Sequence, residues 1–407
     1  MTSKRRIAIF TGNRAEYGLQ YPILKAVDEH PGLDYFLLVS GAHLDKNFGL
    51  TLEEIHSDGF SIEAEIKIEM NPDLTISTAQ AIGAGVLSIS EVLRRIQPDI
   101  MVVYADRFEG FAAVIAASQM NIPTAHIEGG DLTEGGALDD SVRHAMTKLS
   151  HLHFTTNQQA TNRLLAMGEE PWRVHTVGFP AIDLITAGMF ASPQEISTRL
   201  GLDLSQPIVL FTQHPVTTEF VQAELQIRPS LQVIKRLATS GVQVIMTYPN
   251  NDAGSLAIIA ELESFNGLGI AGVKLYPSLG RSLYHGILAL AREPEGRIAC
   301  LGNSSSGIKE TPAFGCPAVN IGSRQKGRLR GDNVLDVDYD ERSIMEAVLH
   351  CLNNDNFRAV CRDAENPYYH GNAGTKIATI LAEVHLDQKL IRKAMTLQGK
   401  VINGWYR

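Results

Sequence analysis

Residues 99–127, DIMVVYADRFEGFAAVIAASQMNIPTAHI, indicate the fold class of this chain. The apolar runs 99–105 and 122–127 are typical of buried strands, and the stretch 108–119 between them has a helical pattern. Strands that are apolar throughout and separated by a helix pair in parallel inside a sheet that is covered on both faces. The stretch therefore predicts an α/β fold built on a parallel sheet.

The same alternation continues on both sides of this stretch and predicts two Rossmann-like domains, 1–185 and 186–369. A chain of 407 residues is long enough for more than one core. We interpret the polar segment 191–207 as the connection between the domains, and expect a C-terminal helix over about 370–407 to pack back on the first. Further strands are expected at 6–11, 35–40, 151–156, 208–213, 242–248, 273–278, 298–303 and 317–322, and a long helix at 75–96.

Composition narrows the class of protein. Hydrophobic residues make up 44% and charged residues 20%, as in globular proteins, and the net charge of −9 argues against a nucleic-acid partner. No uninterrupted apolar run approaches the roughly 20 residues of a membrane span, so we expect no membrane association. The four cysteines, at 300, 316, 351 and 361, show no metal-binding spacing. They predict packed, reduced thiols in a cytoplasmic protein, and we expect neither a metal nor a cofactor.

Acidic residues follow two of the predicted strands. Asp106 comes after the strand at 99–105, Glu128 after the strand at 122–127, and Asp139 at the start of the next helix. Ligands of open parallel sheets bind beyond the carboxyl ends of the strands, where these side chains should gather. Asp106 and Asp139 could each simply cap a helix, but capping does not explain Glu128. Close carboxylates push their pKa values apart and so supply an acid and a base, with Arg143 as a partial counter-charge.

One basic candidate residue follows the first predicted strand of each domain. Arg14, after 6–11, has the permanent charge and forked geometry that suit phosphate, although a solvated arginine is the plainer interpretation. His214, after 208–213, precedes a proline and is therefore held in an extended conformation. It could donate a proton or bind phosphate, or it could be a loop histidine bonded to a backbone carbonyl.

The run 301–328, LGNSSSGIKETPAFGCPAVNIGSRQKGR, is the most distinctive in the chain. Small residues around Ser304 and Ser305 would let backbone amides and hydroxyls approach a phosphate at the start of a helix. Glu310, on the first turns of that helix, could accept hydrogen bonds from ribose hydroxyls or merely favour the helix dipole. Arg324 follows the next strand and could reach the same phosphates. Carboxylates in one domain and a diphosphate cradle in the other fit a nucleotide sugar.

Motifs in both halves resemble one known family. TGNRAEYG, HIEGGDLTEGGALDDSVRHAMTKLSHLHF, QHPVTT and GNSSSGIKETPAFGCP, in this order, are similar to the hydrolysing UDP-N-acetylglucosamine 2-epimerases of the nucleotide-sugar 2-epimerase family. The resemblance runs from about residue 6 to about 385. It implies the glycosyltransferase-B architecture, with two domains facing a central cleft. It also implies conversion of UDP-GlcNAc and water to ManNAc and UDP through a 2-acetamidoglucal, for sialic-acid-type sugars.

The resemblance also implies roles for the candidate residues. Asp106, Glu128 and Asp139 would be the acid/base set, supported by Arg143, in the N-terminal domain. His214 would act on the leaving diphosphate or as a general acid. The C-terminal domain would bind UDP through Ser304, Ser305, Glu310 and Arg324, and Arg14 of the N-terminal domain would contact its phosphates.

Several alternatives stay open at this point. The same chemistry could act on a UDP- or GDP-linked 2,4-diacetamido-2,4,6-trideoxyhexose of a legionaminic acid pathway. An ordinary glycosyltransferase would need an acceptor, and a non-catalytic nucleotide-sugar sensor would not need Asp106, Glu128, Asp139 and His214 together. The family implies a homodimer or homotetramer. The carboxylate that removes the C2 proton is not assigned.

Overall fold

A computed structural model describes residues 4–44, 52–68, 75–133, 138–250, 252, 254–397, 401, 402, 405 and 406. The side chains of residues 14, 15, 42, 75 and 217, and of those beyond 400, are not among the described parts. The chain divides into two compact units. The first comprises Met1–Asp131, Leu138–Asp183 and Tyr368–Arg407, and the second comprises Leu132–Ala137 and Leu184–Pro367.

The first unit is built on a seven-stranded parallel sheet in the order β3-β2-β1-β4-β5-β6-β7. The three central strands β1, β4 and β5 are almost entirely buried because their runs are apolar throughout. The order reverses between β1 and β4, so the switch point of the sheet lies there. The strands are β1 (Arg5–Thr11), β2 (Leu33–Ser40), β3 (Ile62–Ile66), β4 (Ile100–Tyr104), β5 (Thr124–Ile127), β6 (Leu152–Thr155) and β7 (Val174–Thr176).

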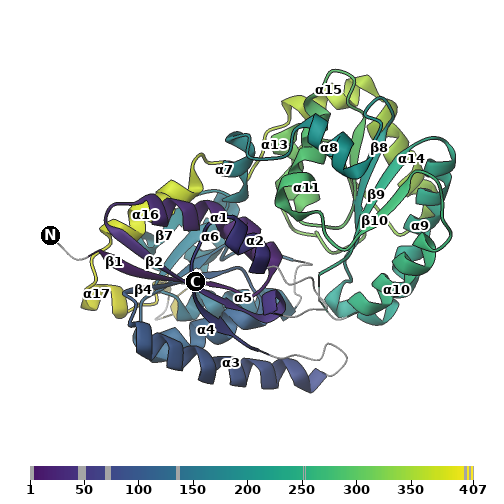
Figure 1. The fold of residues 1–407 in the computed structure, drawn as a ribbon. Coiled ribbons are helices and arrows are strands. Elements are labelled where there is room, and N and C mark those ends of the chain that lie inside the picture. Colours follow the sequence, from purple (N-terminus) through teal and green to yellow (C-terminus); the bar gives the residue numbers. More distant parts are fainter. Residues whose placement is uncertain are drawn as a thin grey trace. The chain divides into compact units, whose positions relative to one another are not determined.

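Helices cover both faces of this sheet (Figure 1). One face carries α3, α4 and α5, and the other carries α1 with α16 packed against it. The helices are α1 (Arg14–Glu29), α2 (Leu52–Ser57), α3 (Thr75–Ile96), α4 (Phe108–Gln119), α5 (Leu138–Leu149), α6 (Gln158–Ala166) and α7 (Ala181–Thr186), followed near the C-terminus by α16 (Ala373–Glu383) and α17 (Gln388–Ile391).

Helix α3 is more apolar than the sequence analysis suggested. Over Ile76–Ile96 it has the length and hydropathy, 1.3, that a membrane span would need, although no uninterrupted apolar run marks it. Ala81, Ile89 and Leu93 pack it onto the core beside α4. Its opposite face is exposed, with Leu87 at 72%. The helix therefore covers the sheet with one side, and apolar and charged side chains share the side that faces outward.

The C-terminal segment is not the single helix expected over about 370–407. Helix α16 ends at Glu383, and a second start at Asp387, whose side chain accepts the amide of Leu390, gives only the short α17. Arg173 caps the end of α17, because it donates to the carbonyls of Lys389 and Leu390 in that helix and of Arg392 directly after it. A two-stranded pair, β14 (Val401–Ile402) and β15 (Trp405–Tyr406), follows.

The second unit contains a six-stranded parallel sheet in the order β10-β9-β8-β11-β12-β13. Its switch point lies between β8 and β11, so both units have the same Rossmann topology and the predicted α/β class is confirmed. Gly302 ends β11 with φ +129°, and a Cβ there would lie 1.9 Å from the carbonyl oxygen of Thr212. The strands are β8 (Ile208–Thr212), β9 (Gln243–Thr247), β10 (Val273–Tyr276), β11 (Ile298–Gly302), β12 (Ala318–Ile321) and β13 (Val334–Val337).

The segment 191–207 is a structural part of the second unit and not the connection that its polar composition suggested. A capping box formed by Ser192 and Glu195 starts α8 (Pro193–Leu200), and Ile196 and Leu200 bury its inner face. All four cysteines are buried and free, as predicted. The other helices of this unit are α9 (Ala223–Thr239), α10 (Ser255–Asn266), α11 (Gly280–Ala289), α12 (Ser306–Lys309), α13 (Thr311–Phe314), α14 (Glu341–Asn353) and α15 (Asp355–Asp363).

Candidate active site

The first unit turns sharply at the carboxyl ends of β4 and β5. The two strands are in register up to Tyr104 and Ile127, and the next residue of each, Ala105 and Glu128, has a positive φ of 53° and 66°. The amide of Ala105 bonds the carbonyl of Ile127 at 3.0 Å. Non-glycine residues at positive φ cost roughly 1–3 kcal/mol each and occur mainly where function requires them. Both turns aim the following polar residues at one edge of the sheet.

Arg143 is the electrostatic centre of this edge. Its guanidinium is almost fully buried and forms an ion pair with Asp106, while Nη1 donates to Asp140 Oδ1 at 3.1 Å and to the carbonyl of Asp131 at 2.7 Å. Burial alone would lower the pKa of Arg143, but the surrounding aspartates, Asp139 included, raise it above its ordinary value. The arginine is therefore a fixed positive charge that holds several carboxylates together.

The carboxylates predicted from the sequence have different environments. Asp106 does not cap α4, because Arg107 occupies the N-cap position and makes no side-chain bond there. Glu128 is 5% exposed, whereas Asp139 is half-buried in the first turn of α5. Asp140, the neighbour of Asp139 on α5, is within hydrogen-bond distance of Arg143, and the sequence analysis did not single it out.

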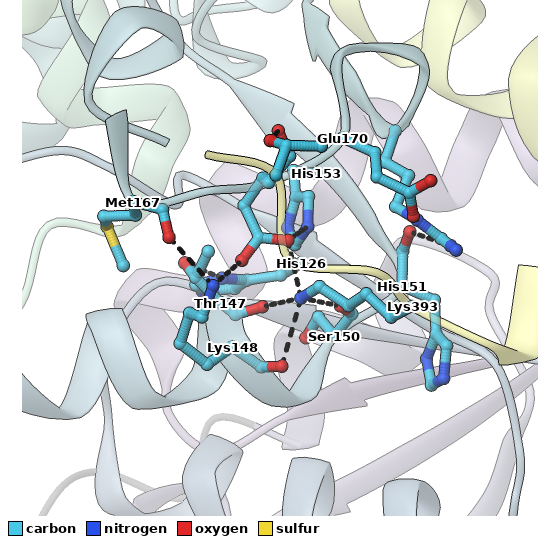
Figure 2. Close-up of polar contacts among 12 residues, drawn as sticks. His126, Thr147, Lys148, Ser150, His151, His153, Met167, Glu170 and Lys393 are labelled. Atoms are coloured by element: carbon cyan, nitrogen blue, oxygen red, sulfur yellow. Dashed lines mark hydrogen bonds and ion pairs between the residues drawn. The ribbon is translucent and has the colours of Figure 1, made fainter. Parts of the chain in front are cut away.

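Buried polar contacts support α5 from behind (Figure 2). Lys393 donates to the backbone carbonyls of Thr147, Lys148 and Ser150 at 2.8, 3.0 and 2.6 Å, where the last turn of α5 leaves carbonyls unpaired. His126 contacts the Thr147 hydroxyl through Nδ1 at 3.1 Å and the carbonyl of Ala105 through Nε2 at 2.7 Å. One ring thus connects α5 to the turn that carries Asp106.

A second pair of buried acids lies at the same edge and was missed by the sequence analysis. Glu16, on α1, accepts the Gly12 amide at 2.8 Å, and Glu109, on α4, lies against Gly12 with Arg107 at 3.6 Å. Burial, followed by the charge of Glu109, raises the pKa of Glu16 to about 8. The only sequence signal was position, since both glutamates stand one helical turn after the ends of β1 and β4.

The second unit gathers neutral groups at the ends of β8, β9 and β11. The side chain of Asn303 bonds both the amide and the carbonyl of His214, at 2.6 and 2.9 Å. His214 Nδ1 accepts the amide of Asn250 at 3.1 Å, which leaves the ring proton on Nε2. Burial and then the charge of Arg324 lower the pKa of His214 to about 3. The ring of His214 is therefore neutral, and its Nδ1 accepts an amide instead of donating to a backbone carbonyl.

The other candidates of the second unit surround Asn303. Arg324 donates to its carbonyl at 3.2 Å and lies 3.9 Å from Asp252, and Ser304 and Ser305 follow it directly in the chain. The expected helix after the serines is only the four-residue α12, so its dipole is small. Glu310 lies between α12 and α13, not on the first turns of one helix. The side chain of Arg14 lies outside the described residues.

Each unit thus presents polar groups at the carboxyl edge of a Rossmann sheet, acids with a buried arginine in one and the neutral His214 and Asn303 beside Arg324 in the other. Within the described residues, no three His, Cys, Asp or Glu side chains are grouped as metal ligands. Paired acids with a buried arginine suit proton-transfer chemistry, and nucleotide-sugar enzymes are the class that this combination of fold and polar groups suggests.

Comparison with known proteins specifies the class. The model of the UDP-N-acetylglucosamine 2-epimerase family matches residues 25–382, and the chain belongs to this family. It is 33% identical over 389 residues, 96% of this chain and 98% of the relative, to a hydrolysing UDP-N,N'-diacetylbacillosamine 2-epimerase of Legionella pneumophila. A UDP-N-acetylglucosamine 2-epimerase of Neisseria meningitidis is 32% identical, with 87% and 89% of the two chains covered. The chain is therefore a nucleotide-sugar 2-epimerase.

Solved structures agree on the fold. The UDP-GlcNAc 2-epimerase of N. meningitidis, crystallised with UDP-GlcNAc, superimposes with a TM-score of 0.76 at 19% identity and covers 93% of this chain and 99% of its own. The glycosyltransferase-B type of fold, expected from the resemblance, is confirmed at the level of fold class.

Proposed function

We propose that this protein is a hydrolysing UDP-N-acetylglucosamine 2-epimerase, which converts UDP-GlcNAc and water to ManNAc and UDP. The observation that carries the proposal is the cluster of Asp106, Asp139 and Asp140 around the buried Arg143, beside Glu128 at the end of the neighbouring strand. A reaction that removes and returns a proton at carbon needs carboxylates held ready in two protonation states.

The chemical steps are assigned to the first unit. One carboxylate removes the proton from C2 of the sugar while the C1–O bond breaks, and the electron pair leaves with UDP. The C1=C2 bond of 2-acetamidoglucal forms in this elimination. Water then adds to C1 as a second acid returns a proton to the opposite face of C2, and the proton that the water loses is taken up by the carboxylate left on that acid. Asp106, Glu128 and Asp139 are the candidates for the two proton transfers, and Arg143 holds Asp106 in place.

The leaving group is assigned to the second unit. His214, as a neutral donor, would bond an oxygen of the diphosphate, and Ser304, Ser305 and Arg324 would share its negative charge. Glu310 would accept hydrogen bonds from the ribose, and Arg14 of the first unit is assigned to the phosphates by resemblance alone. Stabilising UDP as it leaves matters because the C2 proton is only weakly acidic.

The reaction in D2O tests the proposal. Elimination and hydration should place one deuterium at C2 of the released ManNAc, and proton NMR of the product checks this. A control with unlabelled product incubated in D2O without enzyme corrects for solvent exchange. Released ManNAc that carries hydrogen at C2 would contradict the elimination route.

A second substrate has specific support. Two relatives are named for diacetylbacillosamine. They are 33% and 34% identical to this chain, and the matched regions span 98% and 86% of their lengths. The second is named for both the GDP-linked and the UDP-linked sugar. A relative named for polysialic acid biosynthesis is 30% identical. Incubating the enzyme with UDP-GlcNAc and with UDP- and GDP-diacetylbacillosamine, at equal concentration, decides between them by the ratio of kcat/KM.

We also propose that the protein forms a homodimer through the exposed face of α3, which carries Ile76 and Leu87. Apolar area of this kind is commonly covered by a second copy. Leu87→Glu should yield monomers in light scattering, whereas Leu256→Glu, at an exposed leucine of α10, should not change the mass. An unchanged mass for Leu87→Glu would exclude this face.

A cytoplasmic location is proposed from the four buried, free thiols. Cell fractionation with an antibody to the chain tests it.

A further inference from the structure

Glu310 is held by one of its two oxygens. Oε2 accepts the Ser306 hydroxyl at 2.8 Å and contacts His285 Nε2 at 3.0 Å, and neither bond reaches Oε1. The residue is 7% exposed. A carboxylate in which two donors share one oxygen keeps the lone pairs of the other oxygen for a further donor. Glu310 is therefore oriented on one side and able to accept on the other.

His285 makes this contact from a different element. It lies on α11, is 4% exposed, and its ring centroid stands 5.5 Å from that of Phe314. Its other nitrogen, Nδ1, has no hydrogen-bond partner among the described residues. Packing alone would be better served by an apolar side chain, because an unpaired buried nitrogen is costly. The contact with Glu310 is the polar interaction that accounts for a histidine at this position.

The ionised form of Glu310 depends on these neighbours. Burial raises the pKa of Glu310, but the bond and charge of His285, the bond of Ser306 and the charge of Lys309 more than offset it, so the pKa lies below its ordinary value. An ionised carboxylate is a stronger acceptor than a neutral acid, and its bonds to hydroxyl groups are worth more. Loss of His285 would leave the side chain of Glu310 less firmly held, and would also make Glu310 a weaker hydrogen-bond acceptor.

We propose that His285 is a positioning residue that holds Glu310 as the acceptor for the ribose hydroxyls and thereby makes the nucleotide site selective for ribonucleotides. The inference rests on the proposed function, in which Glu310 contacts the ribose of UDP. His285 itself touches no substrate and acts only through Glu310.

Binding of UDP and 2′-deoxy-UDP, measured by calorimetry on the full-length chain, tests this role. Wild type should bind UDP about tenfold more tightly than the deoxy form, as the loss of one bond to a charged group implies. His285→Phe and His285→Leu, which lack a donor, should reduce this ratio below about threefold, and His285→Gln, which keeps one, should restore most of it. His350→Phe, at an exposed histidine of α14, is the matched control and should keep the wild-type ratio.

A double-mutant cycle separates positioning from packing. In the Glu310→Gln background, His285→Phe should leave the ratio unchanged within about twofold, because there is no carboxylate left to position. A wild-type ratio in His285→Phe or His285→Leu would overturn the proposal. The proposal would also be overturned if wild type is active in the epimerase assay but binds UDP and 2′-deoxy-UDP with equal affinity. No binding of UDP and no turnover would instead reject the proposed function.

Discussion

The two units share one sheet topology but carry different kinds of side chain at the switch point of the sheet. In the first, the switch point between β1 and β4 is followed by buried acids, with Arg143 and Arg107 as their counter-charges. In the second, the switch point between β8 and β11 is followed by His214 and Asn303, which are neutral, and the side chain of Asn303 bonds the backbone of His214. A sheet edge that moves protons needs groups that change charge, whereas an edge that binds an anion works with groups whose charge stays constant, neutral dipoles and arginine alike.

The largest effect should follow from neutralising an acid of the first unit. Asp106→Asn and Glu128→Gln should each lower kcat about 10²- to 10⁴-fold, the usual contribution of a proton-transfer group, and leave UDP affinity within about threefold. Coupled assays of UDP release and calorimetry measure the two quantities. Asp34→Asn, at an exposed ion pair with Lys4, is the control and should turn over normally. Wild-type rates in both site variants would reject the assignment.

Removing the counter-charge should act on stability. Arg143→Met leaves Asp106 and Asp140 without their buried partner, and breaking such a pair costs about 3–5 kcal/mol of the free energy of unfolding. Urea unfolding followed by tryptophan fluorescence reports on the first unit, because both tryptophans, Trp172 and Trp405, belong to it.

Arg94→Met is the matched control for this variant. Arg94 forms an ion pair on α3 in which both side chains are more than 70% exposed, and its loss should change the free energy of unfolding by at most about 0.5 kcal/mol. Equal losses for the two arginines would mean that the buried cluster does not depend on Arg143.

Lowering the pH should reduce the free energy of unfolding of the first unit, because two of its buried histidines are neutral in the fold. Burial lowers the pKa of His126 to about 3 and of His153 to about 4, from 6.5. Between pH 6.5 and 4 the unfolded chain binds protons that the folded chain does not, so stability falls as the pH falls, by up to about 1.4 kcal/mol per pH unit for each ring. Above about pH 6.5 this stability is fully present.

His153→Gln keeps a donor for Glu169 without a group that titrates. The loss of stability between pH 7 and pH 5, measured by fluorescence in urea, should be smaller in this variant than in wild type. His56→Gln, at an exposed histidine of α2, should keep the wild-type loss. An identical pH dependence in all three proteins would show that His153 is not neutral in the fold.

The same contrast explains what could be predicted from the sequence. Ten strands were expected within about two residues of their ends, most of them because they are continuous apolar runs, and α3 and α4 were placed at their bounds. In the two parallel sheets, the three strands without a prediction, β3, β7 and β13, all lie at sheet edges. Their sequences, IEAEI, VHT and VLDV, mix polar and apolar residues because one side of an edge strand meets solvent.

For the site, chain position was enough to find groups at the ends of strands but not their partners. Asp106 and Arg143 stand 37 residues apart, and nothing local in the sequence indicates that they pair. Asn303 was quoted in a glycine- and serine-rich run, where its side chain could not be distinguished from a loop amide. Lys393 was missed because its function is to bond the carbonyls of α5, which depends on how the C-terminal segment packs.

The smallest effect should come from a neutral donor of the second unit. His214→Gln exchanges one neutral N–H donor for another of different reach, and should weaken UDP binding about three- to tenfold, as for one uncharged hydrogen bond. Because the pKa of His214 is lowered to about 3, the ring is uncharged from pH 6 to 8, so the ratio of wild-type to variant affinity should be constant over that range. Taking the ratio cancels the titration of UDP itself. A ratio that grows steeply below pH 6.5 would mean that His214 binds the diphosphate as a cation. The second unit would then resemble the first in using a group that changes charge, and the contrast between a proton-transfer edge and an edge of constant charge would fail.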